Sequence, residues 1–257
     1  MEIISRVSRG SNMDQIYISK KRYGLEVGSY VAITSVLKKP TIKSYYYHIK
    51  KLEPIKVQVI NDLFNFLSNA ENVIIAGSFL EKGFNANDID IIIINGVNSQ
   101  TEKFIMEKFG MVAHVIEISY DALKKGVNTD PLFQMLLSKF VAKKRILFKI
   151  EQKINYKLLD LHLLKSKILL DNFDYLSGKE KYNMLRNVFA IKRFLELKEL
   201  SKEYIDLEIA NYFGKNSIKE VNDNIVEKKS FINKYRILYD GLFNKIMEGI
   251  KNESEQK

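Results

Sequence analysis

Residues 73–94 read VIIAGSFLEKGFNANDIDIIII, and this stretch decides the fold of the chain. The apolar run Val73–Ala76 predicts a short buried strand that ends at Gly77-Ser78. After a polar segment, Asp88-Ile89-Asp90 opens a second apolar run, which predicts another buried strand. The sequence therefore places a Gly-Ser pair at the end of one strand and two carboxylates at the start of the next.

The two aspartates predict a site for a divalent cation. Residues two apart on a strand point to the same face, so Asp88 and Asp90 lie side by side. Two like charges at that distance repel each other unless a cation lies between them, and oxygen ligands favour Mg2+ or Mn2+ over zinc. Gly77 lets a ligand approach the backbone closely. Backbone N–H groups there, with the Ser78 hydroxyl, can hold phosphate oxygens.

An ordinary turn is the alternative interpretation, with Asp88 and Asp90 as turn caps and Gly77-Ser78 as a bend. Two features argue against it. An unpaired carboxylate inside an apolar strand is costly, and Asp90 has that position. In addition, the Gly-Ser pair stands at the end of the preceding strand.

The flanking sequence predicts an α+β fold with a C-terminal helical bundle. Pro54 suits the first position of a helix, and apolar residues recur after it at helical spacing. From about residue 154 glycines and strand patterns nearly disappear, which is typical of amphipathic helices in a bundle. The expected helices run from Pro54 to about residue 68, from a Ser99–Glu102 capping box to Phe109, from Asp130-Pro131 to Phe140, and over 155–173, 179–199, 201–213 and 217–248. The other expected strands are 15–18, 30–33, 112–118 and 146–148.

The Gly-Ser and Asp-Ile-Asp pattern resembles the signature of the polymerase-β-like nucleotidyltransferase superfamily, over about residues 70–150. The resemblance implies a small mixed β-sheet core and transfer of a nucleoside monophosphate from an NTP to an acceptor hydroxyl. It implies that Gly77 and Ser78 contact the triphosphate. It also implies that Asp88 and Asp90 ligate two Mg2+ ions, which activate the hydroxyl and stabilise the leaving pyrophosphate. Minimal members of the superfamily often carry Ala-Arg-Gly after Gly-Ser, so Lys82 is the candidate basic phosphate contact here.

The superfamily's third carboxylate, which often serves as general base and second-metal ligand, has one candidate. Glu117 is the only acid in the predicted strand 112–118, and it lies between two isoleucines as the pattern requires. We therefore expect Glu117 to be a catalytic residue and metal ligand with Asp88 and Asp90. His114 points to the opposite side of that strand by alternation. If His114 faces the aspartates, Glu117 cannot, and the third acid is missing.

The first forty residues resemble one half of an AbrB-type swapped-hairpin domain. The resemblance rests on Arg6-Val7-Ser8, on residues 15–21 and on residues 27–31. It departs from the family at Ser19 and Ser29, where proline and aspartate are usual. It implies a homodimer of interleaved strands that binds DNA, and the alternative is a β-hairpin packed on the catalytic domain. In either case the candidate phosphate contacts are Arg6, Arg9, Lys20, Lys21 and Arg22.

Composition and charge narrow the function classes. The net charge is +10, and residues 1–50 hold nine Lys/Arg against three Asp/Glu. This predicts a nucleic-acid partner, with a basic surface that lacks such a partner as the alternative. The chain has no cysteine, which excludes a disulfide scaffold, thiolate zinc sites and thiol nucleophiles. Because neither a signal-peptide pattern nor a bilayer-length apolar run is present, we expect a cytoplasmic protein without a membrane partner.

These features predict three regions: residues 1–40 as the AbrB-like segment, 41–152 as the nucleotidyltransferase domain and 153–257 as the helical bundle. We expect an enzyme that uses Mg2+ or Mn2+ and an NTP to modify RNA, such as tRNA, or a protein. The alternatives are a non-catalytic nucleotidyltransferase-fold protein that binds DNA, and a regulatory partner of the toxin–antitoxin type. The bundle resembles helical partner domains of minimal nucleotidyltransferases, some of which are RNases. Because no histidine follows Arg186, we expect the bundle to be structural or to bind the acceptor.

Overall fold

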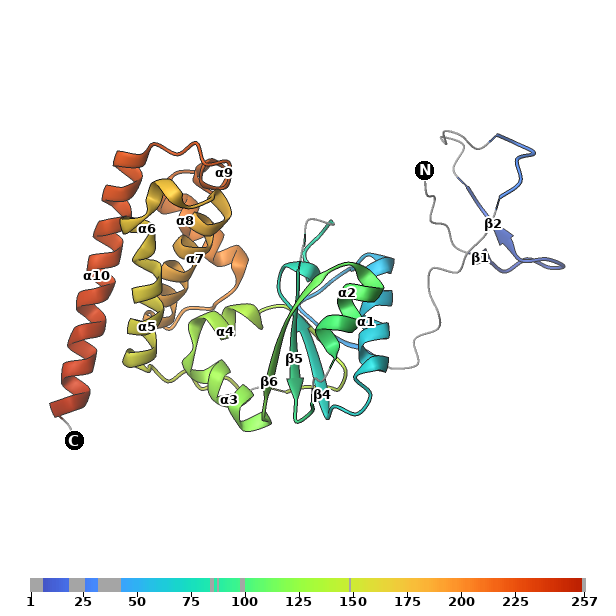
Figure 1. Ribbon diagram of the computed structural model, residues 1–257, viewed down its shortest axis with the longest axis horizontal. Helices are drawn as coiled ribbons and strands as arrows, with labels where there is room; N and C mark the ends of the chain where they lie inside the picture. Colours follow the sequence, from blue (N-terminus) through green and yellow to red (C-terminus); the bar gives the residue numbers. More distant parts are fainter. Residues whose placement is uncertain are drawn as a thin grey trace. The chain divides into compact units, whose positions relative to one another are not determined.

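The structure is a computed structural model, and it describes residues 7–18, 26–31, 43–83, 86, 88–97, 100–147 and 149–255. The chain divides into two compact units, Met1–Val36 and Leu37–Lys257 (Figure 1). Within the described ranges, every helix is too short or too polar to cross a bilayer.

In the first unit, strands β1 (Val7–Ser8) and β2 (Gln15–Ile16) form an antiparallel pair. Strand β2 is shorter than the predicted strand 15–18, and the described residues of the predicted strand 30–33 are not in a strand. Arg9 lies in the connection between β1 and β2 and is exposed. Phosphate contact by this unit stays a prediction, because the other candidates lie outside the described residues: Arg6, Lys20, Lys21 and Arg22.

Five strands of the second unit form one mixed sheet. They are β3 (Tyr45–Tyr47), β4 (Asn72–Ala76), β5 (Asp88–Ile94), β6 (Val112–Ile118) and β7 (Phe140–Ala142). Their order is β3-β7-β4-β5-β6, and Figure 1 shows β4, β5 and β6 side by side. Strands β5 and β6 run parallel, and the other neighbouring pairs are antiparallel. This sheet, with the helices that follow, confirms the predicted α+β fold.

The sheet is covered by helices on both faces, and β5 supplies apolar side chains to each. The helices are α1 (Pro54–Phe66), α2 (Thr101–Phe109), α3 (Tyr120–Thr129) and α4 (Pro131–Leu136). Ile89, Ile91 and Ile93 are buried in a core with α1 and α2, whereas Ile92 and Ile94 are buried in a second core with α3. Asp88 and Asp90 share the face of this second set, because residues two apart on a strand point the same way.

The predicted helix from Asp130-Pro131 to Phe140 is too long. It ends at Leu136, and Phe140–Ala142 forms β7 instead. Strand β7 lies between β3 and β4. Backbone hydrogen bonds to two neighbouring strands therefore outweigh the local preference for another helical turn.

The tyrosines before α1 form the edge strand β3 and contribute to the sheet core. The ring of Tyr47 stacks on Phe140 with 4.1 Å between centroids, and its hydroxyl accepts a 2.6 Å hydrogen bond from the N–H of Ile146. Ile146 and its successor are not in a strand, contrary to the predicted strand 146–148. Phe148 lies outside the described residues, as does Ser99 of the predicted capping box.

Lys143 fastens the C-terminal end of α1 to the sheet. It follows β7 directly, and only 9% of it is exposed. Its ammonium group donates hydrogen bonds to the backbone carbonyls of Leu67 (2.9 Å), Ser68 (2.7 Å) and Ala70 (2.8 Å). These carbonyls belong to the C-cap of α1 and to the residues just after it, so one side chain holds the segment that follows the helix.

The C-terminal residues form the expected helical bundle, with two additional breaks. Its helices are α5 (Tyr156–Ser166), α6 (Ile168–Asp171), η2 (Phe173–Tyr175), α7 (Gly178–Leu195), α8 (Lys202–Phe213), α9 (Ser217–Asn222) and α10 (Lys228–Glu255). The predicted helix 217–248 is interrupted between α9 and α10, because Asn224 has a left-handed φ of 60°. The predicted helix 155–173 is interrupted at Lys167.

The bundle packs on the sheet through α4. Met135 of α4 is buried in the core of the bundle. Asp130, which caps α4 by accepting a 2.8 Å hydrogen bond from the N–H of Leu132, lies 3.1 Å from Nε2 of His162 on α5. Burial raises the pKa of Asp130, but the hydrogen bonds from His162 and the backbone outweigh burial and hold the pKa below its usual value. Asp130 therefore joins the sheet region to the bundle.

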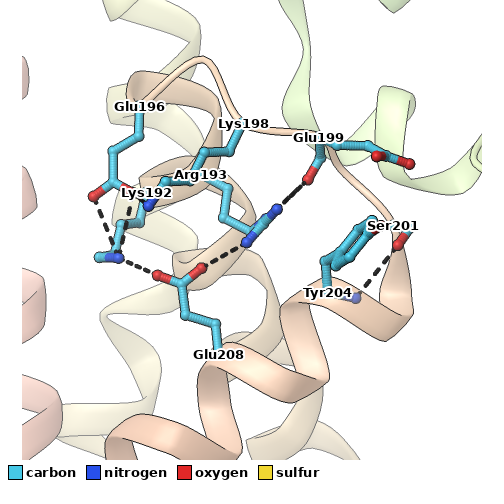
Figure 2. Close-up of polar contacts among 8 residues, drawn as sticks. All are labelled: Lys192, Arg193, Glu196, Lys198, Glu199, Ser201, Tyr204 and Glu208. Atoms are coloured by element: carbon cyan, nitrogen blue, oxygen red, sulfur yellow. Dashed lines mark hydrogen bonds and ion pairs between the residues drawn. The ribbon is translucent and has the colours of Figure 1, made fainter.

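A polar cluster fixes α8 against the end of α7, and Figure 2 shows its members. Glu208 of α8 forms ion pairs with Lys192 and with Arg193 of α7, the second at 3.0 Å. Arg193 also donates to the backbone carbonyl of Glu199 through Nε (2.9 Å) and a terminal nitrogen (2.6 Å). The connection between the two helices is thus held by one guanidinium.

Glu208→Ala tests this cluster. We expect it to lower the free energy of unfolding by about 2 kcal/mol, because Lys192 and the largely buried Arg193 lose their shared carboxylate. Urea denaturation followed by circular dichroism measures the change. Glu253→Ala, at the exposed end of α10, is the control and should change stability by less than about 0.5 kcal/mol. Equal losses in the two variants would contradict a stabilising role for the cluster.

Candidate functional site

Gly77 and Asp90 are in contact where β4 ends. Asp90 lies opposite Ala76 in the antiparallel pairing of β4 with β5. Gly77 has a φ of 77°, and a Cβ at this position would lie 1.9 Å from Oδ2 of Asp90. Only glycine leaves room for this carboxylate. The side chain of Asp90 therefore packs against the backbone of Gly77, and the predicted approach of a ligand there stays a prediction.

Ser78 joins the second aspartate. It begins the short 3-10 turn η1 (Ser78–Leu80), and its hydroxyl donates a 3.2 Å hydrogen bond to Oδ1 of Asp88. The side chains of Asp88 and Asp90 are each 27% exposed, so a solute can reach both carboxylates. The structure thus brings four of the predicted residues together, from the end of β4 and the start of β5.

His114 of β6 also contacts the aspartates. The parallel pairing of β5 and β6 sets His114 opposite Asp90, so the two side chains point to the same face. Nδ1 of His114 lies 3.4 Å from Oδ1 of Asp90 and 3.8 Å from Oδ2 of Asp88. With 59% of its side chain exposed, the ring faces solvent as well as the carboxylates.

Glu117 does not lie with the aspartates, so its expected place in the site does not fit the structure. It stands opposite Ile93, whose side chain is buried in the core with α1 and α2. Glu117 therefore points to the other face of the sheet from Asp88 and Asp90. The register of β6 therefore places His114, and not an acidic residue of β6, beside the two aspartates.

The carboxylate of Asp90 is held where negative charge is unfavourable. Burial raises the pKa of Asp90, and the charge of Asp88 adds to this, while His114 and Arg186 of α7 act in the opposite direction. A cation between the carboxylates would offset both burial and repulsion. In the described part of the chain, no three His, Asp or Glu side chains are arranged to hold a metal ion alone. Two carboxylates nevertheless fit Mg2+, which usually completes its shell with substrate phosphates and water.

The loop after Ser78 is anchored from the first turn of α1. The N–H of Gly83 donates a 2.8 Å hydrogen bond to Oε1 of Glu53, which lowers the pKa of Glu53. The buried Lys56 donates to the carbonyl of Glu81. Lys82 is exposed in this loop, and its side chain forms no ion pair within the described residues. Contact of Lys82 with a phosphate stays a prediction.

Helix α8 of the bundle lies beside the same loop. Oε1 of Glu81 is 3.8 Å from Nζ of Lys139 and 3.9 Å from Nζ of Lys202, in the first turn of α8. Lys139 also pairs with Glu203 of α8. These residues and Arg186 were not predicted as site neighbours. They are far from residues 73–94 in sequence, and only the packing of the bundle brings them near.

Comparisons with protein-family models, with curated proteins and with solved structures found no match for this chain.

Proposed function

We propose that this protein transfers a nucleoside monophosphate from an NTP to an acceptor hydroxyl. The observation that carries the proposal is the convergence of two carboxylates, Asp88 and Asp90, on the Gly77-Ser78 turn. Paired carboxylates beside a Gly-Ser turn are suited to a metal-bound triphosphate. When bound, Mg2+ supplies the charge that polarises the phosphates and activates the acceptor hydroxyl.

The protein's own residues divide the remaining tasks. Asp88 and Asp90 hold the cation and position it at one end of β5. The hydroxyl of Ser78 orients Asp88. The backbone N–H groups of Ser78 and of Phe79, the next residue of η1, donate to phosphate oxygens. Lys82 is the exposed basic residue of the adjoining loop. His114 contacts both carboxylates and takes the place expected for a third acid.

A nucleic-acid acceptor is the favoured substrate class. The support is the net charge of +10, because a basic protein attracts a polyanion. RNA, and tRNA in particular, is the first acceptor to test, and a protein hydroxyl is the second. DNA binding by the first unit and dimerisation through its strands stay predictions.

Labelling with radioactive NTPs tests the proposal. The protein is incubated with each α-labelled NTP, Mg2+, and total RNA or total protein, and products are separated on a denaturing gel. We expect a labelled acceptor with wild-type protein and none with Asp88→Asn combined with Asp90→Asn. If no acceptor is labelled and NTP binding shows no dependence on Mg2+, the proposal is wrong.

Two variants, His114→Gln and Glu117→Gln, test which of these residues acts in the site together with Asp88 and Asp90. We expect His114→Gln to lower the transfer rate about 100-fold, because the ring contacts both carboxylates. Glu117→Gln, on the other face of β6, should leave the rate within about twofold. Single-turnover rates at saturating NTP measure both. A large loss in Glu117→Gln with an unchanged His114→Gln would reverse this assignment.

A further inference from the structure

Arg186 of α7 is half-buried, and its guanidinium has an unusual environment. Its guanidinium lies 5.7 Å from the ring centre of Tyr182, one helical turn earlier. Its Nε is buried, and within the described residues this atom has no hydrogen-bond partner. A buried N–H without a partner costs about 1–3 kcal/mol, so a native protein rarely keeps one unless a ligand or water satisfies it.

The surroundings hold Arg186 in place without neutralising it. Tyr182 is 8% exposed, and its hydroxyl donates a 2.5 Å hydrogen bond to Oδ1 of Asp206 on α8. The ring of Tyr182 is therefore fixed, and a fixed aromatic face supports a guanidinium. Across the described residues, Arg186 forms no ion pair with Asp90 or Asp206, although its charge influences the pKa of both. The guanidinium is near two carboxylates and bonded to neither.

Two contacts bring the bundle close to the candidate site. Helix α7 packs on α4 through the bundle core, which includes Met135. The start of α8 reaches the loop after Ser78, where Glu81 lies 3.9 Å from Lys202. The charge of Arg186 acts on Asp90 itself. Because the ring of Tyr182 beside Arg186 is bonded to α8, and α8 contacts the loop after Ser78, Arg186 lies on the side of the bundle that adjoins the candidate site.

We propose that Arg186 is a phosphate-binding residue that holds the polyphosphate of the nucleotide at the Asp88/Asp90 site. A guanidinium donates paired hydrogen bonds to phosphate oxygens, which is the geometry that Arg provides better than Lys. In this arrangement, residues of the sheet hold the cation, and Arg186 of the bundle contacts the phosphates. This inference rests on the proposed function, because the phosphate it assigns belongs to the NTP.

Isothermal titration calorimetry with inorganic tripolyphosphate and with Mg-ATP tests this inference. We expect Arg186→Met to bind both probes at least about tenfold more weakly than the wild type. Arg186→Lys should recover part of that loss, and it retains a cation if the methionine variant fails to fold. Arg236→Met, at an exposed position of α10, is the matched control and should bind as the wild type does. Circular dichroism verifies the fold of each variant.

The outcomes separate this inference from the proposed function. Wild-type affinity in Arg186→Met, or in Arg186→Lys if only that variant folds, overturns the role of Arg186 and leaves nucleotidyl transfer intact. Binding of tripolyphosphate that depends on Arg186, without labelling of any acceptor, supports the anion site and contradicts the transfer reaction. No binding of either probe by the wild type overturns the role of Arg186, and no binding of any Mg-NTP overturns both. Asp88→Asn should weaken Mg-ATP binding, because it removes a ligand of the cation.

Discussion

Gly77→Ala is expected to abolish function and to destabilise the protein at the same time. The new Cβ would lie 1.9 Å from Oδ2 of Asp90, so the carboxylate must leave its position on the Gly-Ser turn. We expect nucleotide transfer to fall about 100-fold or more, because displacement by about 1 Å is enough for such a loss. The φ of 77° adds backbone strain of about 2 kcal/mol.

Gly110→Ala is the matched control for this prediction. Gly110 also has a positive φ, 66°, but a Cβ there has no neighbour within 4 Å. It should lose about 1 kcal/mol of stability through strain alone and keep full activity. Urea denaturation and single-turnover transfer measure the two effects separately. If Gly77→Ala keeps wild-type activity, the contact between Gly77 and Asp90 is not needed for function.

Lys143→Met is expected to be the most destabilising substitution outside the hydrophobic cores. It removes three hydrogen bonds to backbone carbonyls, two of them buried, and replaces the ammonium group with a thioether that cannot donate. We expect the free energy of unfolding to fall by about 3 kcal/mol, because the carbonyls of Ser68 and Ala70 lose the donor from Lys143 and that of Leu67 keeps only the N–H of Ala70. The change should appear as a lower urea midpoint with an unchanged slope.

Lys144→Met provides the comparison for Lys143→Met, since it makes the same chemical change at the next residue. Lys144 is exposed, and its backbone groups, not its side chain, bond to Asn72. We expect a change of less than about 0.5 kcal/mol. Similar losses in both variants would mean that removal of positive charge, and not the helix-end contact, accounts for the effect.

The centre of the candidate site was predictable because it depends on local patterns. Gly77-Ser78 and Asp88/Asp90 lie within one stretch of 22 residues, and the i, i+2 rule places both carboxylates on one face. The choice between His114 and Glu117 was not predictable in this way. It depends on the register of β6 against β5, which tertiary packing sets and the sequence of β6 alone does not encode.

The fold was predicted best where elements are long and periodic. Strands β4, β5 and β6 and helix α1 agree closely with the apolar pattern. The short strand β7 was mistaken for the end of a helix, because three apolar residues carry no period of their own and gain their conformation from β3 and β4. The sequence did not predict that Arg186 would lie near the candidate site. Its position depends on how α7 packs, about one hundred residues from the aspartates.

The alternation along β5 limits how the length of this protein can change during evolution. A single residue inserted between Asp90 and Ile94 would exchange the two faces for the rest of the strand. Either the isoleucines of one core would then face the helices of the other, or the carboxylates would leave the face on which they contact Gly77 and Ser78. Substitutions in β5 can be tested one at a time by selection, but an insertion or deletion there alters both cores and the site together. We therefore expect homologues to vary in length in the loops around β5 and to keep the length of the strand itself.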